Sequence, residues 1–65
     1  MEIPKNAREA LELALYLAVT AGNDEDMIRA AKIARDISFD MPERVIEAAM
    51  EAVEARLARE RSALH

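Results

Sequence analysis

The sequence predicts an all-α protein, an up-down-up three-helix bundle whose C-terminal helix is long. Strong helix formers (Ala, Leu, Glu and Arg) dominate its 65 residues, and only Tyr16 and Phe39 are aromatic. The single glycine and the two prolines stand where helices are expected to begin or end. Between these positions, apolar residues recur at spacings of three and four, as on one face of a helix. So short a chain forms one domain, here residues 1–65.

The first helix is expected over about residues 4–21. Pro4 suits a first helical position, because proline lacks the N–H that a helix start leaves unsatisfied. Asn6, with Glu9 three residues later, offers an alternative start of the capping-box type. Gly22 can adopt the left-handed conformation that commonly ends a helix.

The second helix is expected over about residues 24–38, capped by Asn23 or Asp24. The third is expected over about residues 41–63, capped by Asp40. Both connections are short, so consecutive helices should be antiparallel neighbours.

Each helix carries an apolar seam that should form the core. In the third helix this seam alternates steps of four and three residues, the spacing of helices packed lengthwise. Phe39 is expected to fill the space between the second and third helices. The candidate core residues are Leu11, Leu15, Met27, Ile33, Ile37, Ile46, Met50, Val53 and Leu57.

The first helix is apolar around most of its circumference. No charged residue occurs from Leu13 to Asn23, although 34% of the chain is charged. Its apolar arc is about twice the arc, a little over 100°, that a core-facing helix needs. Either the helix is central and covered by the other two helices, or one edge contacts a second copy of the chain or another protein. Because so short a chain buries only about 60% of its unfolded surface, we favour the second interpretation. The candidate interface residues are Leu13, Leu17 and Ile28, with Tyr16 at the rim.

Cys and His, which often serve in catalysis and metal binding, are nearly absent from the sequence. There is no Cys, and the only His is the last residue, His65. An acidic ridge on the third helix lacks the Glu-x-x-His pairs that di-metal helix bundles use. The sequence therefore predicts no catalytic residue, no cofactor and no metal, and a protein that is not an enzyme. The residues of the acidic ridge are Glu43, Glu47, Glu51 and Glu54.

Charge and hydropathy argue against nucleic acid and membranes as partners. A net charge of −4 argues against a general binder of nucleic acid or of anionic membranes. The uncharged run is too short for a membrane span, which needs about 20 residues. The N-terminus is too polar for a signal peptide, so the expected location is the cytoplasm.

These observations favour a non-enzymatic protein–protein interaction or assembly module, most simply a homodimer that buries the wide apolar face of the first helix. Regular capping and Ala-rich helices are also typical of a designed bundle without natural activity. A small DNA-binding helix-turn-helix regulator is a further alternative, although Glu43 and Glu47 would then oppose the phosphates. A small inhibitor that docks on a host protein is the last alternative, and the residues do not separate it from an oligomer.

Overall fold

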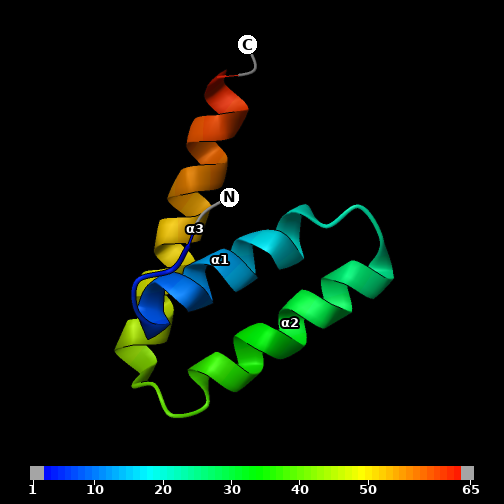
Figure 1. The fold of residues 1–65 in the computed structure, drawn as a ribbon. Coiled ribbons are helices and arrows are strands. Elements are labelled where there is room, and N and C mark those ends of the chain that lie inside the picture. Colours follow the sequence, from blue (N-terminus) through cyan, green and yellow to red (C-terminus); the bar gives the residue numbers. More distant parts are fainter. Residues whose placement is uncertain (1–2, 64–65) are drawn as a thin grey trace.

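The computed structural model describes residues 3–63, which form three helices and no strand (Figure 1). Their bounds are Ala7–Thr20 for α1, Asp24–Ser38 for α2 and Glu43–Ala63 for α3. The predicted all-α, three-helix fold is confirmed. Within the described residues, no helix is both long and apolar enough to cross a bilayer.

Two asparagines start the first two helices. The side-chain oxygen of Asn6 accepts a hydrogen bond from the backbone N–H of Glu9 at 2.9 Å. Asn23 accepts one from the backbone N–H of Asp26 at 2.8 Å. Both bonds satisfy donors that no preceding carbonyl of the helix can reach. Of the two predicted starts for the first helix, the one at Asn6 is confirmed and the one at Pro4 is wrong.

Two predicted helix caps are also wrong, although α1 ends and α3 begins within two residues of the predicted bounds. Ala21 ends α1 in an extended conformation (φ −60°, ψ 141°), and Gly22 does not have a positive φ. Because Ala21 leaves the helical dihedral angles, α1 ends there without a left-handed cap. At the other boundary, the carbonyl of Pro42 accepts a hydrogen bond from the backbone N–H of Ile46 at 3.2 Å. Since this bond belongs to the first turn of α3, Asp40 stands too early in the chain to cap the helix.

The first helix is the centre of the fold. α2 runs back beside α1, and α3 packs against α1 on another side and crosses it obliquely (Figure 1). α2 and α3 themselves meet only marginally. The first helix is therefore central in the fold, but its two neighbours do not close over each other and do not cover Leu17 completely.

Alanines form most of the buried contact between the helices. Leu11 and Ala49 are almost completely buried, at 1% and 0% exposure, and share one cluster with Ala14 and Ala34. This cluster takes side chains from all three helices. Because a methyl side chain occupies little space, the helix axes can approach closely along these seams.

Three predicted core residues lie on the surface instead. Met27, Ile33 and Met50 are 43%, 50% and 47% exposed, which corrects the sequence prediction. In α2 the buried residues are Ala30 and Ala34, with the larger side chains of Met27 and Ile33 at the edges of this seam. The hydrophobic pattern identified the right faces, but it assigned the contact to the bulky residues rather than to the alanines between them.

The remaining predicted core residues are buried or partly buried. Phe39, expected between the second and third helices, is 84% exposed, because α2 and α3 meet too little to enclose a ring. The residues that the structure places in or beside the core as predicted are Leu11, Leu15, Ile37, Ile46, Val53 and Leu57.

Replacing Leu11 with Ala should lower the free energy of unfolding by about 2–5 kcal/mol, because it leaves a cavity where all three helices meet. Val19→Ala, at a site that is 64% exposed, is the control and should change it by less than about 0.5 kcal/mol. Urea unfolding at one fixed protein concentration measures both. Equal effects of the two substitutions would contradict this assignment of the core.

Candidate interaction surface

Tyr16 of α1 contacts two residues of α3. Its hydroxyl donates a hydrogen bond to Oε1 of Glu60 at 2.6 Å, and the guanidinium of Arg56 lies 3.9 Å from the centre of its ring. Nε of Arg56 also lies 3.4 Å from Oε2 of Glu60. Glu60 interrupts the apolar seam of the third helix. Its polar partners are Tyr16 on α1 and Arg56 on α3. Tyr16 was predicted at the rim of an interface, and the structure places it in a contact within the chain.

This contact changes the acidity of Glu60. The hydrogen bond from Tyr16 lowers the pKa of the carboxyl below its ordinary value, a partial loss of hydration acts in the opposite direction, and Arg56 adds to the lowering. A lowered pKa in the folded state stabilises the fold above the ordinary carboxyl pKa. That stabilisation is lost as the pH falls through the lowered pKa.

We expect Tyr16→Phe to raise the pKa of Glu60 towards its ordinary value, because the substitution removes the hydroxyl that favours the charged carboxylate. The acid-induced loss of stability that Glu60 contributes should become smaller with it. NMR titration of the Glu60 side-chain carbonyl carbon measures the change. An unchanged pKa would show that the hydroxyl does not act on this carboxylate.

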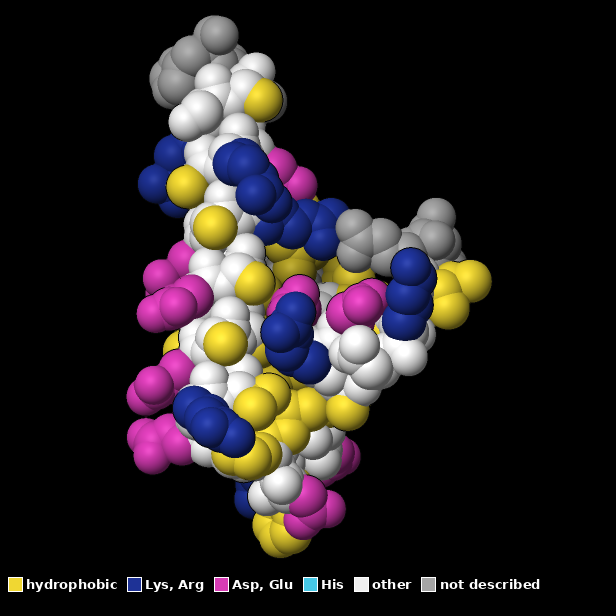
Figure 2. Space-filling model, turned by 90° about the vertical axis from the view of Figure 1, so that its left-hand side faces the viewer, with side chains coloured by type: hydrophobic (Ala, Val, Ile, Leu, Met, Phe, Trp, Pro, Cys, Tyr) yellow, Lys and Arg dark blue, Asp and Glu magenta, His cyan; other side chains and the backbone are white. Residues whose placement is uncertain are grey.

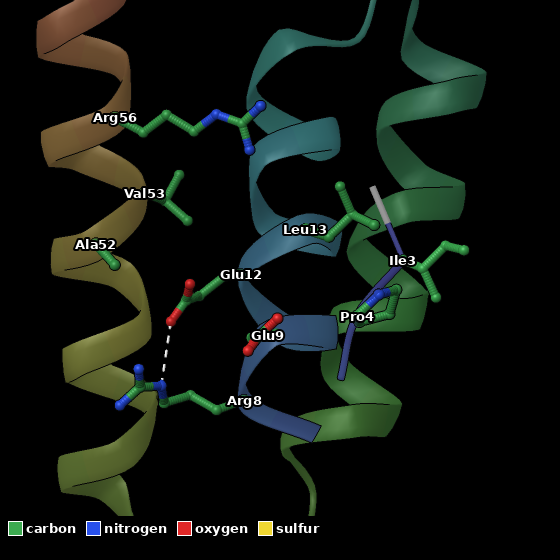
Figure 3. Close-up of a pocket in the computed structure, with 9 residues that line it drawn as sticks. All are labelled: Ile3, Pro4, Arg8, Glu9, Glu12, Leu13, Ala52, Val53 and Arg56. Carbon is green, nitrogen blue, oxygen red and sulfur yellow. Dashed lines mark ion pairs between the residues drawn. The ribbon is translucent and has the colours of Figure 1, made fainter. Parts of the chain in front are cut away.

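A first groove, of about 380 Å³, lies between the N-terminal segment, α1 and α3 (Figure 3). Leu13 points from α1 towards the side on which Ile3 and Pro4 lie, and it is partly buried (Figure 3). Two arginines border the groove, and each has an acidic partner within the chain. Arg8 pairs with Glu12 at 3.3 Å, and Arg56 pairs with Glu60 at 3.4 Å. Both arginines of the groove are therefore neutralised within the chain, which leaves no cation there for an anionic ligand.

A second groove, of about 330 Å³, runs over the seam between α1 and α2. Leu17 from α1 and Ile33 from α2 line it, and each is 50% exposed. At its margin, the two charged lining residues have opposite signs: Arg29 lies 3.9 Å from Asp26, and it also lies 3.3 Å from Glu25, outside the lining. An apolar centre with a polar margin is the usual anatomy of a protein–protein interface. We call this region the Leu17–Ile33 surface; its other lining residues are Thr20, Ala21 and Ala30.

The structure divides the predicted interface residues among different places. Only Leu17 lines the Leu17–Ile33 surface; Leu13 lines the first groove. Ile28 is 50% exposed but lines neither groove. Sequence analysis missed Ile33, which it placed in the core. The signal that could have found it is the pair of alanines, Ala30 and Ala34, which are small enough to make the contact with α1.

The described part of the chain holds no group of three His, Cys, Asp or Glu side chains that could bind a metal ion. His65 lies outside the described residues. No protein-family model matches this chain, and no curated protein or solved structure matches it. The candidate site therefore depends on the geometry of the exposed apolar residues.

Proposed function

We propose that this chain is an assembly module whose copies associate through the Leu17–Ile33 surface. The observation that carries the proposal is the half exposure of Leu17 and Ile33, which lie together over one seam of a domain with few large buried side chains. Association would bury apolar area that the single chain leaves in contact with water.

The surface suits contact with its own copy. In a two-fold dimer, the same patch on both copies faces itself, so any unbalanced charge in it would be repelled. Here the two charged residues that line the surface, Asp26 and Arg29, have opposite signs and lie 3.9 Å apart on the same helix. Leu17 and Ile33 of one copy can then face Leu17 and Ile33 of the other without a charge penalty.

The energy of this contact is modest. Fully burying one aliphatic side chain is worth about 1.5–3 kcal/mol, so a half-exposed one adds about 1 kcal/mol. Leu17 and Ile33 on two copies together supply about 4 kcal/mol, which equals the lower limit of the cost of association. The association through this surface alone should therefore be weak and depend on concentration.

Ile33→Glu should reduce the average mass of the assembly, because it places a charge at the centre of the apolar contact. Size exclusion with light scattering over a tenfold dilution measures the mass. Phe39→Glu is the matched control: it adds the same charge at an apolar residue that is more exposed, yet lies outside both grooves. The control should keep the mass of the unaltered chain.

Two results would contradict the proposal. One is an unaltered chain that has the mass of a single copy at every concentration up to the high micromolar range. The other is an equal fall in the average mass of the assembly for Ile33→Glu and Phe39→Glu, which would indicate nonspecific association rather than a defined interface. Circular dichroism of each variant shows whether its helices are retained.

A further inference from the structure

A second apolar edge lies on the other side of the seam between α1 and α2. Met27 precedes Ala30 by three residues, and Ile33 follows it by three, so they lie about 60° to either side of Ala30 on the helix. Ala34, on the Met27 side, shares the buried cluster with Ala49 of α3. Met27 therefore lies on the side of α2 that faces α3, and Ile33 on the opposite side.

α3 has a matching edge. Ile46 packs against the same cluster, and Met50, one turn further along, continues its side of the helix. The opposite side of α3 carries Ala52 and Arg56, which line the first groove. Met27 and Met50, 43% and 47% exposed, thus flank the open side between two helices that meet only marginally.

Beyond Met50, the charge of the α3 surface is mainly negative, because the acidic ridge lies there. Beyond Met27, the exposed cations Lys32 and Arg35 follow along α2, whereas Asp24 precedes Met27 on the same side. Figure 2 shows acidic side chains along the free edge of α3. No ion pair joins either cation or any glutamate of the ridge to another of the described residues. The acidic ridge comprises Glu43, Glu47, Glu51 and Glu54, all exposed.

We propose that this open side binds a second copy of the chain, with α2 of each copy beside α3 of the other. A two-fold axis makes this contact twice, and Met27 and Met50 of both copies lie at its centre. Lys32 and Arg35 of each copy then face the acidic ridge of the other. Within one chain, α2 and α3 meet only marginally, and no ion pair joins these charges among the described residues.

This inference goes beyond the proposed function, because it uses a different surface. The Leu17–Ile33 surface and the Met27–Met50 edges lie on opposite sides of the buried seam of α2, so one copy can use both at once. Two different two-fold contacts per copy close into an assembly of four copies when their axes intersect at right angles, which is the arrangement that we propose. The weak contact at Leu17 and Ile33 then acts together with a second contact that charge orients.

Charge reversal tests the pairing directly. One variant carries Glu47→Lys and Glu51→Lys, and the other carries Lys32→Glu and Arg35→Glu. Each variant alone places like charges opposite each other, so its mass in low salt should fall from four copies to two or fewer, because the remaining contact is weak. A 1:1 mixture restores opposite charges at both contacts and should restore the mass of four copies. All four positions are exposed, and circular dichroism checks that each variant keeps its helices.

The outcomes separate the two proposals. If each charge variant keeps the mass of the unaltered chain, or if the mixture fails to regain a lost mass, the pairing of α2 with α3 is overturned. Should Ile33→Glu still lower the mass in that case, the proposed function stands without this inference. Should each charge variant lose mass and the mixture regain it while Ile33→Glu changes nothing, the Leu17–Ile33 contact fails and this one stands.

Discussion

The structure depends on the packing of α1 against both neighbouring helices through alanines. Ala14, Ala34 and Ala49 surround Leu11, and this cluster is the one place where all three helices contribute to the core. Small side chains bring the helices close to α1, but they bury little apolar area each. The larger apolar residues are left at the edges of the seams, where they stay in contact with water.

This constraint explains which parts of the fold the sequence could predict. Helix number, order and approximate bounds follow from helix propensity, apolar spacing and the capping asparagines, Asn6 and Asn23, which act locally. The partial exposure of Met27 and Met50 could not be predicted in the same way, because it depends on how far apart α2 and α3 lie. A hydrophobic pattern identifies the inward face of a helix but not the distance to the next helix.

The candidate surface was predictable to the same extent. The uncharged run in α1 drew attention to Leu17, which the structure leaves half exposed, since one edge of a helix apolar around most of its circumference is hard to cover with two neighbours. Its neighbour in space, Ile33, comes from another helix and depends on the register of α2 against α1. Tyr16 shows that contacts between residues distant in the sequence could not be predicted. Nothing in its local sequence indicates that its hydroxyl meets Glu60, which lies 44 residues away.

We propose that the apolar edges that the three helices leave exposed are covered by other copies of the chain. The most direct measurement is an isotope-filtered NMR experiment on a mixture of two differently labelled samples of the unaltered chain. The account predicts nuclear Overhauser contacts between the methyl groups of Leu17 and Ile33 in one copy and those in another. If, at high micromolar concentration, every contact of these methyl groups arises within a single chain, the account is contradicted.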